Sequence, residues 1–193
     1  MNLTDLKVPE KVGNVIKEVM SLCGKQPNAV PSESTVNRIV DSKLAVAHKQ
    51  ISDVLLEKKN TTLYTDETKK YGKCIQTYVL TDEDQTSYLL GLREMFNKSG
   101  QSTLDTLKEI LEDFGTHCYQ KERENHMNVG YRILANIRDT MSDRASTEKN
   151  FNHLLEDFRA SILSQVVDNW DNMDEDQKKL CQDLITFFVA FTY

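Results

Sequence analysis

The sequence predicts an α/β domain in which three antiparallel strands precede a helix–strand–helix segment, with a helical arm before it. Over residues 9–58, apolar residues recur every three or four positions, which is the helical period. From residue 60 the pattern changes to short runs rich in β-branched and aromatic residues, separated by polar turns. The helical period returns at residue 102. We therefore expect a helical arm over residues 1–58 and the α/β domain over residues 59–193.

The composition fits one domain with a small appendage: 193 residues, of which 39% are hydrophobic. A net charge of −6 gives the chain no overall field that attracts nucleic acid, so phosphate binding would need a local patch or a metal. The mean hydropathy is −0.53 and no apolar run approaches the ~20 residues of a membrane span, so we expect a soluble, intracellular protein without a membrane partner. The cysteines lack zinc-site spacing and are expected to be free thiols. The histidines also lack such spacing and are expected at the surface: His48, His117, His126 and His153.

Two helices are predicted in the arm. The first covers residues 9–23 and ends at Gly24, and the second extends to about residue 58. Either Ser32 or Ser34 can cap the start of the second helix, because its hydroxyl can accept a hydrogen bond from a backbone amide of the next turn.

Three strands follow, over residues 61–65, 73–80 and 86–93, and short polar loops join them into an antiparallel meander. We expect the first strand, around Leu63, to be central in the sheet and buried on both faces.

After residue 102 the sequence predicts helices with one short strand between them. A helix is predicted from residue 102 to residue 118, and residues 120–130 are polar and suit a loop or a frayed helix end. Residues 131–141 fit a helix or a strand equally well, and the element order favours a short fourth strand there. Helices are expected over residues 147–167 and from residue 174. The apolar residues 187–193 suggest that the domain is incomplete at its C-terminus, and we expect this segment to form an exposed fifth strand that self-associates.

Three antiparallel strands followed by helix–strand–helix is the opening order of the ribonuclease H-like fold, a mixed sheet in which the fourth strand lies beside the first. Carboxylates at the ends of these neighbouring strands, about 4.8 Å apart, can share a divalent metal. Asp66 ends the first strand and Asp143 follows the fourth. The sequence therefore predicts that Asp66 and Asp143 bind Mg²⁺ or Mn²⁺.

Three segments resemble uncharacterised invertebrate proteins: residues 63–72 (LYTDETKKYG), 88–95 (YLLGLREM) and 140–145 (TMSDRA). Those proteins are in turn similar to the ribonuclease H-like catalytic domains of DNA transposases, of which the hAT type is one. The resemblance covers residues 32–193 and implies metal-dependent DNA strand cleavage or transfer by two Asp and one Glu. It implies DNA as partner, the nucleus as location, and catalytic and metal-binding roles for Asp66 and Asp143. The third acid and a Cys-x-x-His element of such domains are not found, so we expect an inactive or incomplete form.

Other interpretations of the same residues stay open. Asp66 suits a turn and Asp143 suits a helix N-cap, while Glu67 is an alternative metal ligand. Weak candidates for contact with a DNA backbone are Lys69, Lys70, Lys73 and Arg144. The rival function is a non-catalytic protein-interaction module that binds a partner through its arm or its apolar C-terminal end.

Overall fold

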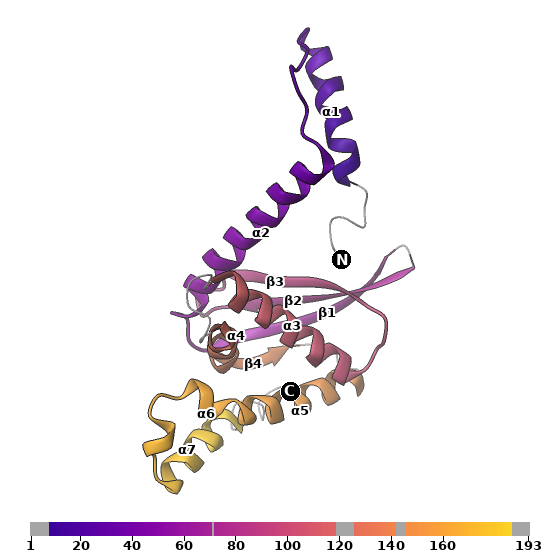
Figure 1. Cartoon of the computed structure of the whole chain (residues 1–193). Helices are drawn as coiled ribbons and strands as arrows, with labels where there is room; N and C mark the ends of the chain where they lie inside the picture. The colour runs from indigo at the N-terminus through magenta and orange to yellow at the C-terminus, as the bar shows by residue number, and fades with distance from the viewer. Residues whose placement is uncertain (1–7, 71, 119–125, 142–145, 187–193) are drawn as a thin grey trace. The chain divides into compact units, whose positions relative to one another are not determined.

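The computed structural model describes residues 8–70, 72–118, 126–141 and 146–186, which fold as two compact units, Met1–Ala47 and His48–Tyr193 (Figure 1). The sequence analysis ended the arm at residue 58, whereas the structure ends the first unit at Ala47. The difference arises because the last turns of the second helix are part of the second unit, where His48, Ser52 and Leu55 are buried.

The first unit contains helix α1 (Val8–Leu22) and most of helix α2 (Glu33–Leu55). Gly24, with a φ of +66°, ends α1 as expected, in a conformation that glycine adopts without strain. Of the two candidate caps, Ser32 is the one used: its Oγ accepts a hydrogen bond from the amide of Thr35 at 3.3 Å.

The second unit is built on a four-stranded sheet in the order β3-β2-β1-β4. The predicted meander is confirmed: β1 (Thr61–Lys70), β2 (Lys73–Thr81) and β3 (Ser87–Met95) pair antiparallel. The strand β4 (Ile137–Met141) pairs with β1 in parallel, so β1 is central in the sheet. The strand β1 extends five residues beyond its apolar part, because residues 66–70 continue to pair with β2 up to a turn in which Gly72 has a φ of +76°.

Helices of the second unit follow the strands: α3 (Gly100–Cys118), α4 (His126–Ala135), α5 (Ser146–Ser161), α6 (Leu163–Val166) and α7 (Glu175–Thr186), with a short 3₁₀ turn η2 (Trp170–Asn172). Two sequence predictions were wrong here. A helix begins at His126 inside the predicted loop, and the helix expected over residues 147–167 is interrupted at Ile162. The apolar residues 187–193 and the fifth strand predicted there lie outside the described residues.

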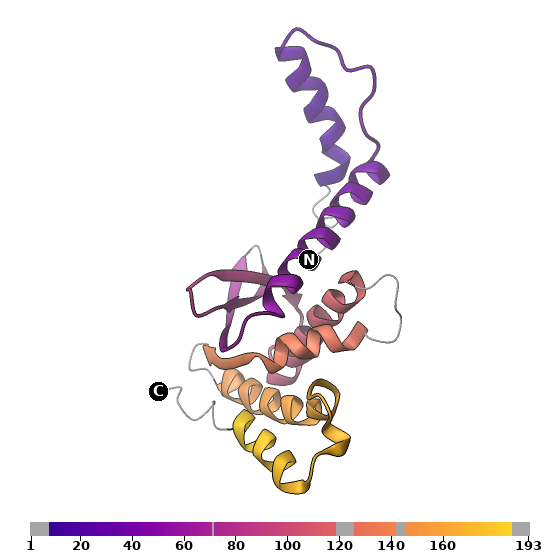
Figure 2. The same ribbon diagram turned by 90° about the vertical axis from the view of Figure 1, so that its left-hand side faces the viewer.

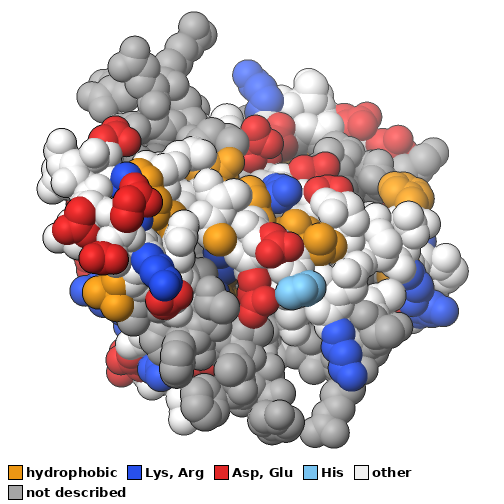
Figure 3. Space-filling view, turned by 90° about the horizontal axis from the view of Figure 1, so that it is seen from below, with side chains coloured by type: hydrophobic (Ala, Val, Ile, Leu, Met, Phe, Trp, Pro, Cys, Tyr) orange, Lys and Arg blue, Asp and Glu red, His pale blue; other side chains and the backbone are white. Residues whose placement is uncertain are grey.

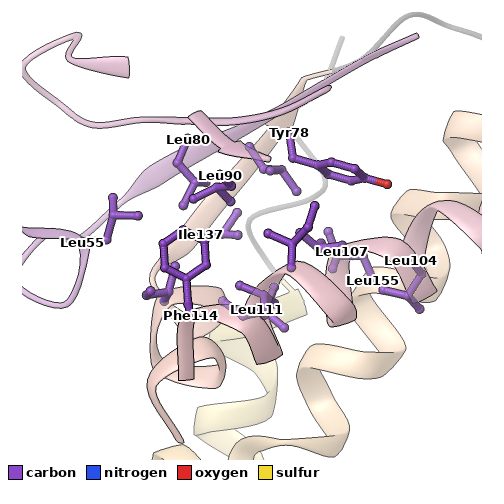
Figure 4. Close-up of a cluster of buried hydrophobic side chains, with 14 of the residues drawn as sticks. Leu55, Tyr78, Leu80, Leu90, Leu104, Leu107, Leu111, Phe114, Ile137 and Leu155 are labelled. Atoms are coloured by element: carbon purple, nitrogen blue, oxygen red, sulfur yellow. The ribbon is translucent and has the colours of Figure 1, made fainter. Parts of the chain in front are cut away.

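The core lies between one face of the sheet and helices α3, α4 and α5 (Figures 2 and 4). On the sheet, Leu63, Tyr78 and Leu80 are fully buried, and α3 faces them with apolar residues at helical spacing: Leu107, Ile110, Leu111 and Phe114. The imidazole of His48 stacks on Phe114 at 4.5 Å between ring centroids, so this histidine is buried rather than exposed as predicted.

The opposite face of the sheet has no described element of the second unit over it (Figure 2). Tyr64, which is next to Leu63 and points to the other side, is 39% exposed. The expectation that the central strand is buried on both faces is therefore wrong for the described residues. None of the described helices is long and apolar enough to cross a membrane.

Candidate functional site

The first predicted metal ligand, Asp66, lies on β1 on the face of the sheet that α3 does not cover. Its strand partner is Thr77 on β2, and its side chain is exposed. Asp66 makes no hydrogen bond or ion pair with another described residue. An exposed carboxylate on a rigid central strand is thus available for a ligand, whereas the turn-forming role would have required bonds to nearby backbone amides.

The second predicted ligand, Asp143, lies in residues 142–145, outside the described part of the chain. The strand that leads to it is described: Leu63 pairs with Thr140, and Tyr64 with Met141. Along the chain, Asp66 and Asp143 each stand two residues beyond this last described pair. Among the described residues, no group of three or more His, Cys, Asp or Glu side chains is arranged to hold a metal ion.

The alternative ligand Glu67 lies on the opposite face of β1 from Asp66 and is already engaged. Lys98 forms an ion pair with its carboxylate and holds the pKa of Glu67 below its usual range. The thiol of Cys74, across the strand pair from Lys69, also hydrogen-bonds to Glu67, while burial raises the pKa of this thiol. Glu67 therefore serves a local network of side chains.

The basic residues near the β1–β2 turn do not form a patch free of acids. The ammonium group of Lys73 pairs with Glu94 at 2.7 Å, while Lys69 and Lys70 are exposed at the end of β1. Arg144 lies outside the described residues. Side chains of both signs are also interspersed on the face of the molecule seen from below (Figure 3).

Several buried polar side chains of β1, β4 and α5 were not predicted from the sequence. The hydroxyl of Thr65 donates to Glu148 of α5 at 3.0 Å, and Thr140 is 6% exposed. Arg159 of α5 is 3% exposed, and burial lowers the pKa of its guanidinium to about 10, although Glu156 and Asp139 oppose this change. Neither the Thr140 hydroxyl nor the Arg159 Nε has a hydrogen-bond partner among the described atoms.

No sequence signal distinguishes these residues, because a Thr on a strand and an Arg on an amphipathic helix are usually at the surface. Thr65, next to Asp66 in β1, thus has a polar contact with α5, whereas Arg159 lies eleven residues further along that helix.

A buried carboxylate, Asp82 in the β2–β3 turn, is structural. It accepts hydrogen bonds from the backbone amides of Asp84 and Thr86, at 3.0 and 2.9 Å, and from the hydroxyl of Tyr88. Lys58 contacts it at 2.8 Å and lowers the pKa of Asp82. Its oxygens are thus used within the turn, and it is no candidate ligand.

A shallow groove of about 300 Å³ lies between α3, α4 and α5. Phe158 and Tyr131 line it, with ring centroids 5.8 Å apart, and the ammonium of Lys108 lies 4.2 Å from the centre of the Phe158 ring. The lysine is thus engaged by the Phe158 ring, and the one acidic residue among the described residues lining this groove is Glu112.

Comparison with known proteins returned nothing that matches this chain, whether among protein-family models, curated proteins or solved structures. The class that the fold itself defines is an α/β domain with a four-stranded mixed sheet, one parallel strand pair and helices packed on one face.

Proposed function

We propose that the second unit is a ribonuclease H-like domain derived from a DNA transposase, and that Asp66 and Asp143 bind one divalent cation, Mg²⁺ or Mn²⁺. The observation that carries this proposal is the parallel pairing of β1 and β4 within the order β3-β2-β1-β4. Tyr64 pairs with Met141, and each aspartate follows its member of this pair by two residues, which supports the proposal further. If the parallel register continues for two residues, Asp143 lies beside Asp66, which is in the middle of β1.

The residue types fit the cation. Mg²⁺ and Mn²⁺ prefer carboxylate oxygens, and Mg²⁺ is commonly held by one or two carboxylates with water completing its shell. Asp66 is exposed and makes no bond within the described residues that a metal would have to break. In an active enzyme of this kind, metal ions activate the attacking oxygen and stabilise the leaving oxygen of a phosphodiester.

The role proposed for Asp66 and Asp143 is cation binding. DNA remains the proposed partner, through Lys69, Lys70, Lys73 and Arg144, and the nucleus the proposed location. Lys73 already pairs with Glu94, which makes the exposed Lys69 the stronger phosphate contact of these two.

A thermal melt with added Mn²⁺ tests the cation site. A ligand that binds only the folded state stabilises it by about 2.7 kcal/mol at 100 times its dissociation constant. We expect Mn²⁺ to raise the Tm of the wild-type chain, and Asp66→Asn and Asp143→Asn each to abolish the rise. Asp171→Asn, an exposed aspartate in η2, is the matched control and should keep it. Equal Tm shifts in all four chains, or none in any, would remove the proposal.

A second function, a protein-interaction module, is favoured by the exposed apolar side chains of α1. Val15, Val19 and Leu22 follow at i, i+4 and i+7 and are 54%, 52% and 88% exposed. This spacing gives a helix one apolar stripe of the kind that lies in a partner's groove. Sedimentation of the full chain against its Val15→Ser/Val19→Ser variant tests whether the stripe mediates association.

A further inference from the structure

The face of the sheet opposite α3 carries an apolar row that crosses all four strands. The pairing register places Leu89 of β3 beside Val79 of β2, Val79 beside Tyr64 of β1, and Tyr64 beside Met141 of β4. Residues paired in this way point to the same face. We call these four side chains the cross-strand row.

The cross-strand row is more exposed than a sheet centre usually is. Tyr64, Leu89 and Met141 are 39%, 49% and 57% exposed, and Leu92, in the next row, is 44% exposed. Monomeric proteins seldom leave several large apolar side chains contiguous in water, and such patches commonly mark interaction sites.

The charged residues that pair into the two rows beside the cross-strand row are acidic, while the exposed Arg138 lies at the register shift next to Asp139. On one side the paired residues are Leu92, Thr77 and Asp66. On the other side they are Ser87, Thr81, Thr62 and Asp139. The charged members of these two flanking rows are thus Asp66 and Asp139, one on each side. The lysines on this face, Lys70 and Lys73, flank the β1–β2 turn and are several residues away from the cross-strand row along the strands.

The other face of the same sheet indicates what kind of element fits. There α3 covers Leu63, Tyr78 and Leu80 with apolar side chains at i, i+3, i+4 and i+7. The cross-strand row spans three strand spacings, about 14 Å, which corresponds to about nine or ten residues of helix at 1.5 Å each.

We propose that the cross-strand row is a docking site for an amphipathic helix of a partner protein, with an apolar stripe flanked on both sides by Lys or Arg. The stripe covers Leu89, Val79, Tyr64 and Met141, and the flanking cations lie beside Asp66 and Asp139. This inference does not depend on a bound cation.

Two synthetic helical peptides with the same leucine stripe test the site, one flanked by lysines and one by glutamates. Fluorescence anisotropy with the full chain in 50 mM NaCl and EDTA should give at least tenfold tighter binding of the lysine-flanked peptide. The preference should shrink at 500 mM NaCl, where exposed charges are screened within a few ångströms. Equal affinity of the wild-type chain for the two peptides would overturn the proposal.

Variants place the binding on this face. Leu89→Gln/Met141→Gln should weaken the lysine-flanked peptide at least tenfold, and Asp66→Asn/Asp139→Asn should remove most of its preference over the glutamate-flanked one. Leu180→Gln on α7, which is 61% exposed, is the matched control and should bind as the wild type does. Unchanged binding by the Leu89/Met141 variant would refute the site. So would a wild-type dimer that this variant dissolves, because a second copy would then be the occupant.

Discussion

Leu63 lies at the centre of the sheet, and shortening it to alanine should lower the free energy of unfolding by about 3–4 kcal/mol. The side chain is 0% exposed, with Leu80 beside it on β2 and Thr140 beside it on β4. Leu63→Ala removes three carbon groups, worth about 2.4 kcal/mol at ~0.8 kcal/mol each. The cavity left between β1 and α3 adds about 1 kcal/mol or more, because a packed core relaxes only partly. Domains of this size are stable by about 5–15 kcal/mol, so the variant should still fold.

The matched control is Leu89→Ala, the same substitution on the open face of the sheet. Leu89 is 49% exposed, so about half of the transfer free energy is lost and no closed cavity forms, which predicts a cost of about 1 kcal/mol. Urea unfolding followed by circular dichroism measures both variants. If the two variants lose unfolding free energy within ~0.5 kcal/mol of each other, the assignment of one buried and one open face of the sheet is refuted. A Leu63→Asp variant should not fold at all, because it buries an unpaired carboxylate, and its cooperative melting would contradict the central position of β1.

Three further predictions follow from local contacts. Gly130→Ala should lower stability by about 1–3 kcal/mol, because its Cβ would lie 2.5 Å from a carbonyl oxygen of α3, and an unchanged Tm would contradict this close crossing of α3 and α4. Asp82→Asn should lower the Tm most at neutral pH, because Lys58 holds the pKa of Asp82 below its ordinary value of about 3.9. The ionised Asp82 therefore stabilises the fold above that value, and the stabilisation is lost as the pH falls through the lowered pKa. A Tm difference from wild type that does not shrink below pH 4 would count against this account. A thiol reagent at pH 8 should modify the exposed Cys23 faster than Cys74, because burial raises the pKa of the Cys74 thiol. Equal rates of modification of the Cys23→Ser and Cys74→Ser variants would contradict this.

Much of the fold follows from local sequence patterns. The strands β1, β2 and β3 were predictable because β-branched and aromatic runs alternate with polar turns, and α3 because its apolar residues keep one helical face. The parallel partner β4 was predictable only from the element order, since the pattern of residues 131–141 suits helix and strand equally.

What the sequence could not predict depends on tertiary contacts. Helix α4 was missed because polar residues precede it, and its packing rests on Gly130, where the lack of a side chain lets two helices approach. The last turns of α2 were assigned to the arm, although the stacking of His48 on Phe114 ties them to the second unit. The burial of Arg159 has no signal in the helical pattern of α5. For the candidate site, Asp66 was expected to end the first strand, but it lies in the middle of β1 because the strand continues to Lys70, while Asp143 stays a prediction.

Anomalous diffraction from crystals of the full chain soaked in Mn²⁺ locates the cation that Asp66 and Asp143 are proposed to share. We expect a manganese peak between the two carboxylates at oxygen distances of about 2.0–2.6 Å, with their carboxyl carbons roughly 4–8 Å apart. Carboxyl carbons more than about twice that distance apart, or manganese bound elsewhere and absent from this position, would refute the shared site.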